Sequence, residues 1–180
     1  MRFVLLVAAV VGLALPASAQ REAVSSTLSP EAAAAVFNDA VIAICLPAVV
    51  SGAIPAGARA KLQATTDPAT RKQSGAAADE TVWDVMAGKG VVTLHEKSGR
   101  CVVSVYGPPA PTTIRALAQQ LVAAGFERLA GGASPNGLGQ NLTGAVGGKS
   151  MMVTLSGSDP GMPGHQSRFS VVTATVFSAS

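Results

Sequence analysis

The sequence predicts an α+β fold, a four- to five-stranded antiparallel sheet with two helices packed on one face. Two segments carry apolar residues at helical spacing, and β-branched runs of strand length follow each of them. Consecutive strands that are joined by short loops are expected to be antiparallel neighbours. The simplest packing of a helix, two or three strands, a second helix and two more strands places both helices on the same side of the sheet.

The first helix is expected to begin at Pro30. Ser29 is a suitable N-cap, proline fits the first turn, and Glu31 complements the positive end of the helix dipole. Apolar residues then recur at helical spacing as far as Cys45. Pro47 lacks a backbone N–H, so we expect it to end or kink this helix. Cys45 should therefore lie in the last turn, on the apolar side.

The segment from Ser51 to Thr81 has the weakest pattern in the chain. Ala58 to Ala64 is expected to form one or two helical turns, and Thr65 to Pro68 reads as a turn. The polar residues from Thr70 to Glu80 predict an exposed loop.

A β-hairpin is predicted after this segment. Val82 to Met86 is expected to be a short strand, which Gly88 to Gly90 ends. The β-branched runs Val91–His95 and Cys101–Tyr106 are separated by a polar loop that contains glycine. Alternation along the second run places Cys101 with the apolar side chains, so Cys101 should face whatever covers the sheet.

The second helix has the clearest amphipathic stripe, which runs from Ile114 to Val122. Thr112 or Thr113 is expected to cap it, and Gly125 should end it with Phe126 as the apolar partner.

The last third of the chain is predicted to contain two strands and two loops. Ala130 to Lys149 is rich in Gly, Asn and Ser and predicts a long loop, followed by a strand over Met151–Leu155. A second loop covers Gly157 to Gln166, and a long strand covers Arg168 to Phe177.

The first nineteen residues predict a secretory signal peptide. A short basic start precedes an apolar run from Phe3 to Leu15, and Ala17 and Ala19 are the small residues that a signal peptidase reads. Cleavage is expected before Gln20, which leaves residues 20–180 as a single domain. The apolar run is about thirteen residues long and too short to span a bilayer. We expect no integral membrane segment after signal removal, and a periplasmic or secreted location.

Composition argues against a nucleic-acid partner. The formal net charge is +3, but the lysines and arginines are scattered and form no stripe with aromatic side chains among them. Alanine is abundant, and we assign it no function.

Two cysteines in an exported chain predict one disulfide, between Cys45 and Cys101. A free catalytic thiol is one alternative, and a zinc site that adds His95 and His165 is another. Neither has the expected spacing, because the chain contains no C-x-x-C and no close histidine pair. We therefore expect no metal and no organic cofactor.

Motifs of catalysis are weak throughout. Gly148-Lys149-Ser150 lacks the glycine that a phosphate loop requires and leads into a strand, so we reject that reading. Asn141-Leu142-Thr143 is a glycosylation sequon with meaning only in a host that glycosylates. A serine triad would need one of the two histidines, and no serine has the nucleophile setting.

Two regions remain as candidate sites. Asp79, Glu80 and Asp84 surround Trp83, and carboxylates beside an aromatic ring are typical of proteins that bind or cleave carbohydrate. The loop from Gly157 to Gln166 is longer than its strands require, and its prolines and glycines restrict its shape. If this loop is the functional site, it should present Met162 and His165 in a defined shape. The alternative is that the loop is a harmless insertion.

Part of the chain resembles small exported proteins of Gram-negative bacteria. The resemblance rests on Phe37 to Pro47, on Gly99 to Pro108, and on Ala124-Gly125-Phe126, and it covers about half of the chain. These motifs are structural, so the resemblance implies export and fold but no activity.

The sequence therefore predicts an exported binding or interaction module of the cell envelope, of which an inhibitor is one form, without catalytic activity. Its partner would be an envelope protein or glycan. The alternatives are a small hydrolase of envelope polymer and an accessory envelope protein. A converging pair of titratable groups in one pocket would favour the hydrolase.

Overall fold

A single antiparallel sheet of eight strands forms the centre of the molecule. The computed structural model describes residues 28–85, 92–97, 99–130, 138–162 and 168–178. The strand order is β1-β2-β3-β4-β8-β7-β6-β5. The strands are β1 (Gln63–Ala64), β2 (Thr81–Asp84), β3 (Val92–Lys97), β4 (Arg100–Tyr106), β5 (Glu127–Arg128), β6 (Gly139–Val146), β7 (Lys149–Ser158) and β8 (Val171–Ser178).

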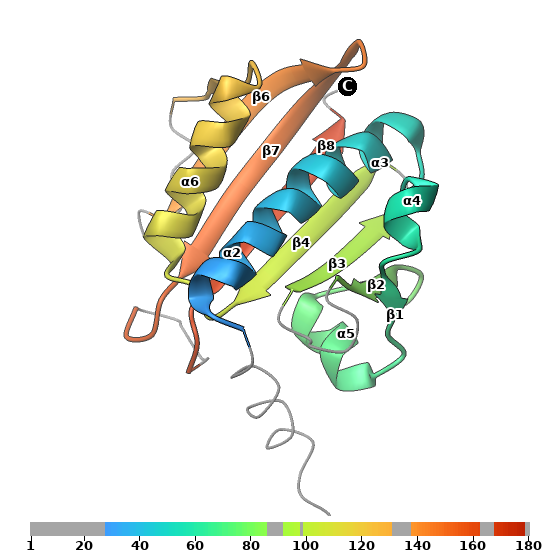
Figure 1. The fold of residues 1–180 in the computed structure, drawn as a ribbon, viewed down its shortest axis with the longest axis vertical. Coiled ribbons are helices and arrows are strands. Elements are labelled where there is room, and N and C mark those ends of the chain that lie inside the picture. The colour runs from blue at the N-terminus through green and yellow to red at the C-terminus, as the bar shows by residue number, and fades with distance from the viewer. Residues whose placement is uncertain (1–27, 86–91, 98, 131–137, 163–167, 179–180) are drawn as a thin grey trace, which may run out of the picture.

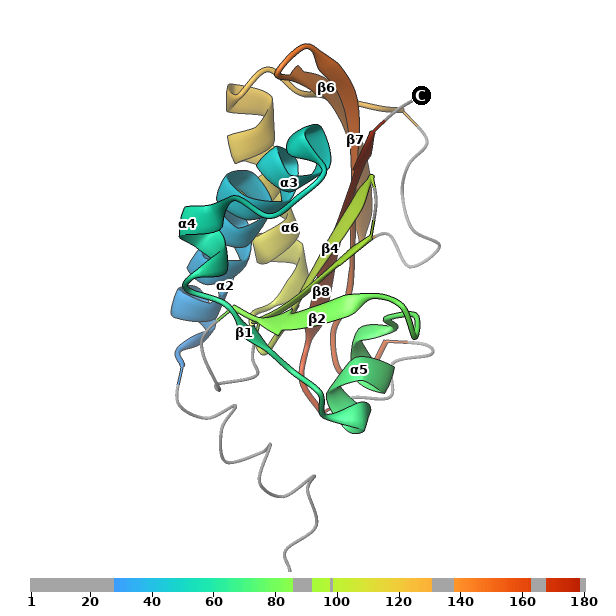
Figure 2. The same cartoon turned by 90° about the vertical axis from the view of Figure 1, so that its right-hand side faces the viewer.

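The main helices cover one face of this sheet (Figure 1). The helices are α2 (Pro30–Asp39), the π-helix η1 (Ala40–Cys45), α3 (Leu46–Ser51), α4 (Ala56–Arg59), α5 (Pro68–Ser74) and α6 (Ala110–Ala123). The first three form one continuous helix of 22 residues. Seen from the side, this helix and α6 lie together in one layer, whereas the short α5 lies beyond the β1–β2 edge on the other side (Figure 2).

The α+β class and the two large helices on one face are confirmed, but the predicted number of strands is wrong. Much of the difference comes from residues 130–149, where the structure has the whole of β6. Gly147 and Gly148 have φ values of 57° and 80° and form a two-residue turn from β6 into β7, as type I′ hairpins require. The strand escaped prediction because Leu142 is its only fully buried side chain.

The expectation that Pro47 ends the first helix is also wrong. The helix continues to Ser51, where Gly52 adopts a left-handed conformation. Before Pro47 the helix widens into η1, and the backbone N–H of Leu46 bonds to Val41 five residues back. Pro47 falls in the first turn of the α-helical segment that follows, where the lack of an N–H is tolerated.

The same helix is long and apolar enough to cross a membrane, with a mean hydropathy of 2.1 over its most apolar window. Half of that window is buried against the rest of the fold, which is the pattern of a core helix. The predicted signal peptide, residues 1–19, and its cleavage point before Gln20 lie outside the described residues.

The core lies between the helices and the inner face of the sheet. Phe37, Leu117 and Leu121 pack from the helices against strand residues such as Leu94 and Val103. Each of these five side chains is fully buried. The confirmed disulfide joins Cys45 of η1 to Cys101 of β4 inside this core, with a Cα–Cα distance of 5.4 Å.

Residues 70–80 are more ordered than the predicted exposed loop. Asp67 caps α5 by accepting hydrogen bonds from the backbone N–H groups of Ala69 and Thr70. Beyond the helix, the side chain of Glu80 is fully buried and forms an ion pair with Arg100 at 2.5 Å. The other carboxylate oxygen of Glu80 accepts a hydrogen bond from the N–H of Ala77. This pairing fixes the turn that leads into β2.

The start of α6 differs from prediction in a similar way. The helix begins at Ala110, ahead of the expected caps Thr112 and Thr113, whose hydroxyls both donate to the carbonyl of Pro109. The N–H of Ala110 donates to the carboxylate of Asp159 at 2.9 Å. A residue 49 positions away therefore satisfies this helix end. The predicted end is confirmed, since Gly125 is left-handed and Phe126 donates back to Leu121.

Gly157 allows α6 to lie close to β7. A Cβ atom there would lie 2.8 Å from the Cβ of Ala110 and 3.1 Å from the carbonyl oxygen of Val171, which belongs to the backbone and cannot move aside easily. We expect Gly157→Ala to lower the free energy of unfolding by about 2 kcal/mol, measured by urea denaturation. Gly57→Ala is the matched control, because a Cβ there meets open space and alanine favours a helix. Equal midpoints for the two variants would contradict the close packing.

Candidate functional site

The described part of the predicted Gly157–Gln166 loop, residues 157–162, has a structural role. Gly157 and Ser158 belong to β7, and the irregular segment starts at Asp159, which holds the N-terminus of α6. The N–H of Asp159 also donates to the sulfur of Met162 at 3.3 Å. Met162 is therefore folded back onto its own turn. His165 lies outside the described residues.

Trp83 belongs to the core and not to the surface. It lies opposite Leu94 on the inner face of the sheet and is 8% exposed. The guanidinium of Arg59 lies over its ring, 5.3 Å from the ring centre, a cation–π arrangement. Its indole N–H has no hydrogen-bond partner among the described residues. Three strands separate β2 from β7, so Trp83 and Met162 do not form one site.

The acidic residues around Trp83 do not converge on one pocket. Glu80 is buried in its ion pair with Arg100, Asp79 is exposed, and Asp84 lies on the opposite face of the sheet from Trp83. A glycosidase needs two carboxylates that face one sugar ring. The free-thiol and zinc alternatives are excluded by the disulfide, which occupies both cysteines.

A groove between α2 and α6 has a volume of about 640 Å³. We call it the α2–α6 groove. Its α2 wall consists of Pro30, Glu31, Ala34, Ala35, Asn38 and Asp39. Its other wall consists of Pro108, Pro109, Thr112, Thr113, Ala116 and Gln120. Ala34 and Ala35 of α2 and Ala116 of α6 have small side chains, which leave space between the two helices.

Asn38 is the unusual residue of this wall. Its side chain is more than nine-tenths buried, and its amide oxygen has no hydrogen-bond partner in the described part of the chain. A buried acceptor without a donor costs about 1–3 kcal/mol. Nearly all such groups in native proteins have a partner, in the protein, in ordered water or in a ligand, so this amide makes the groove a candidate binding site.

Two carboxylates add charge to the groove. Glu31 and Asp39 both line it and both are exposed, whereas no lysine or arginine among the described residues lines it. Glu31 also lies in the first turn of α2, where a negative charge is favourable. Asp39 lies on the ridge that separates the groove from a second hollow of about 560 Å³ beside α4. The groove is thus locally acidic on a chain of net positive charge.

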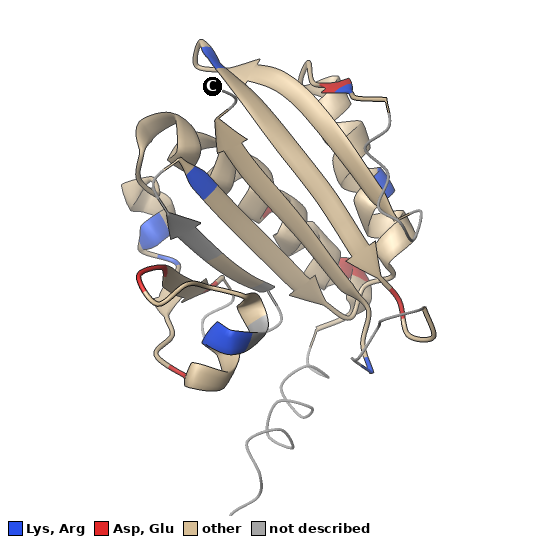
Figure 3. Ribbon diagram, turned by 180° about the vertical axis from the view of Figure 1, so that it is seen from behind, with Lys and Arg blue, Asp and Glu red and all other residues tan. Residues whose placement is uncertain are grey.

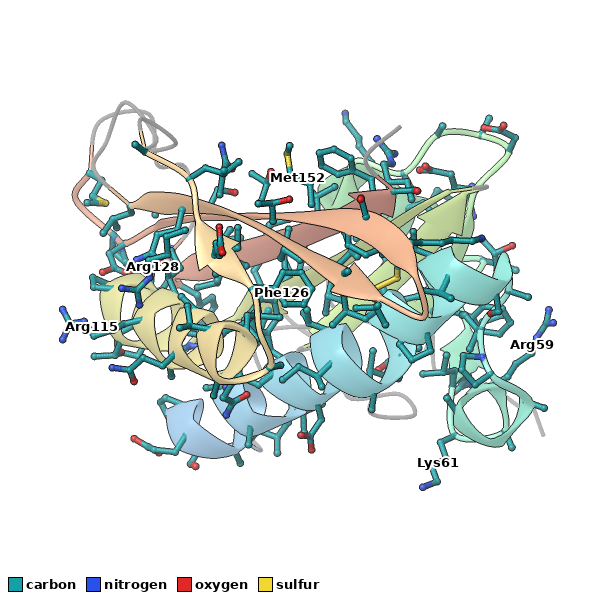
Figure 4. The ribbon with its side chains drawn as sticks, turned by 90° about the horizontal axis from the view of Figure 1, so that it is seen from above. Arg59, Lys61, Arg115, Phe126, Arg128 and Met152 are labelled. Carbon is teal, nitrogen blue, oxygen red and sulfur yellow. A yellow bond between two sulfur atoms is a disulfide. The ribbon has the colours of Figure 1, made fainter. Side chains whose placement is uncertain are left out.

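The opposite face of the sheet is of different character. No helix covers β6, β7 and β8 there (Figure 3). The only charged residue of these three strands is Lys149, the first residue of β7. Ser104 and Thr173 pair across β4 and β8 with their hydroxyl oxygens 3.1 Å apart, and Ser156 continues the row. Figure 4 shows Met152 on this face and Phe126 on the helical side. We call this surface the open face.

Sequence reasoning missed the groove because its main signal is alanine. The alanines of α2 and α6 were left without a function, and only the structure shows that they face one another. Comparison with family models, with curated proteins and with solved structures finds no match to this chain. The groove and the open face are therefore the features from which function is inferred.

Proposed function

We propose that the protein is an exported, non-catalytic binding module of the cell envelope, and that the α2–α6 groove is its binding site. The signal-like N-terminus and the disulfide support export, since disulfides persist in oxidising compartments. The observation that carries the binding site is the buried, unpaired amide of Asn38 in the groove wall. A volume of about 640 Å³ is within the range of ligand sites.

The geometry favours binding over hydrolysis. Glu80, one of the carboxylates close to Trp83 in the sequence, is fully buried and ion-paired, so it lacks access to a substrate. In the groove, the two carboxylates are eight residues apart on one helix and no histidine lines it. Such groups can orient a ligand through charge and hydrogen bonds.

Filling the groove should abolish binding. Ala116→Leu places a larger side chain in the middle of the groove, at an exposed position where the fold tolerates it. Ala123→Leu is the matched control, on the same helix and exposed but outside the groove. Isotope-labelled protein would be titrated with peptide and glycan fractions of a Gram-negative periplasm, while NMR follows the side-chain amide of Asn38.

We expect a saturable shift of that amide in the parent and in Ala123→Leu, and none in Ala116→Leu. Shifts of equal size in all three proteins, or no shift with any fraction, would overturn the proposal. A second candidate is binding of a neutral glycan by the open face, which its row of serine and threonine hydroxyls favours. Shifts confined to Thr154 and Thr173 with the glycan fraction would support that candidate and exclude the groove.

A further inference from the structure

We infer that the α2–α6 groove binds an extended polypeptide segment with two basic side chains four residues apart. This inference rests on the proposed function and names the partner of the same site. It follows from three features of the groove: its charge, the spacing of its carboxylates, and the amide of Asn38.

Charge selects a basic partner. Glu31 and Asp39 line the groove, and neither forms an ion pair with any other described residue. In the part of the chain that the structure describes, the lining contains no cation that would neutralise them. Like charges repel an acidic segment, and complementary charge raises the association rate of a basic one.

The spacing of the carboxylates selects the separation of the two basic groups. Eight residues of α-helix advance about 12 Å along the axis. An extended chain advances about 13 Å over four residues. Side chains at positions i and i+4 of an extended chain point to the same side, so both can face α2. One basic side chain would then meet Glu31 and the other Asp39.

The amide of Asn38 favours a polypeptide backbone between the two basic side chains. Asn38 directly precedes Asp39, and rotation of its amide offers the groove either an acceptor or a pair of donors. A peptide backbone carries both a donor and an acceptor at each residue. Ala34, Ala35 and Ala116 have small side chains, so a backbone can approach both helices closely. The amide oxygen is enclosed by protein and has no donor among the described residues. Rotation of the amide toward the groove would let a partner of this kind pair it.

The test uses labelled peptides and fluorescence anisotropy with the full mature protein. A peptide of sequence SKSASKS carries lysines four residues apart, SKKSASS has the same composition with adjacent lysines, and SESASES reverses the charge. We expect SKSASKS to bind at least about fivefold more tightly than SKKSASS, and SESASES not to bind. Binding of SKSASKS should weaken as salt concentration rises.

Protein variants place the binding on the groove. Asp39→Asn should weaken SKSASKS binding about fivefold, as should Glu31→Gln. Glu127→Gln, which removes an exposed carboxylate outside the groove, should leave it unchanged. Equal affinity for both lysine spacings, or an equal response to Asp39→Asn and Glu127→Gln, would overturn the inference. Displacement of SKSASKS by the polyamine spermidine at equal concentration would also overturn it, in favour of a small amine ligand.

The two proposals fail separately. If periplasmic fractions shift the Asn38 amide and Ala116→Leu abolishes that shift, the groove is a binding site even when SKSASKS does not bind. In that case only the basic segment is wrong. If no fraction shifts the amide and no peptide binds, both are wrong.

Discussion

Replacing Cys45 and Cys101 together by alanine should lower the free energy of unfolding by about 4 kcal/mol. The disulfide joins residues 56 positions apart, and closing a loop of that length restricts the unfolded chain by roughly this amount. Both cysteines are fully buried, so the smaller alanines also remove packing from the core. Thermal unfolding followed by circular dichroism should show a fall in Tm on the order of 10 °C.

A reducing agent is the control for this prediction. Dithiothreitol should lower the Tm of the parent toward that of the double variant and leave the variant itself unchanged. The role of the disulfide would be refuted if the parent and the double variant melted within 2 °C of each other, a difference of only about 0.5–1 kcal/mol.

Arg100→Met should cost about 3 kcal/mol of stability. Methionine retains the apolar stem of the arginine side chain but not its guanidinium. The fully buried carboxylate of Glu80 therefore loses its ion-pair partner. Removing one partner of a buried pair costs about 3–5 kcal/mol, and the lower end applies because the side chain of Arg100 is 45% exposed. Urea denaturation measures the change, and Arg115→Met, at an exposed position of α6, is the control.

A second substitution separates the buried charge from general damage. Adding Glu80→Gln to Arg100→Met should recover part of the lost stability, because a neutral amide is less costly to bury than a carboxylate that has lost its guanidinium. If the double variant were less stable than Arg100→Met alone, the ion pair with Arg100 would not be the main stabilising contact of Glu80. Its other contacts, such as the hydrogen bond from Ala77, would then matter more.

Local patterns predicted the elements whose side chains alternate between core and solvent. The hairpin of β3 and β4 and the stripe of α6 follow apolar periodicity, and the disulfide follows from placing both cysteines on apolar faces. β6 lacked this signal, because Gly144 faces the core without a side chain. A Cβ there would lie 2.7 Å from the ring of Phe126, which occupies that space instead. The ring of Phe126, which lies outside β6, fills the core at this position. The apolar pattern of β6 alone therefore does not reveal that this strand faces the core.

Long-range pairs explain the other failures. From the sequence alone, Glu80 is predicted to be a loop residue. The register of β2, β3 and β4 brings Arg100, twenty positions away, beside it. Asp159 caps α6 from 49 positions away, and no rule about adjacent residues finds such a cap. The groove is a feature of the same kind, since alanines of two separate helices form it. The residues singled out beforehand, Trp83 and Met162, have structural contacts, and the groove residue Asn38 had no motif to reveal it.

The ends of the sheet bear on how copies of this protein meet at high concentration. An outermost strand offers unpaired backbone N–H and C=O groups to any neighbouring chain, and long flat strands in that position promote polymerisation. Here both outermost strands, β1 and β5, have only two residues, and β5 consists of Glu127 and Arg128. Two residues expose few backbone groups for pairing, and at the β5 edge both side chains are charged. A second copy of the chain therefore finds a poor template at either edge. A sheet with six longer strands between these ends is thereby protected against growth into fibrils.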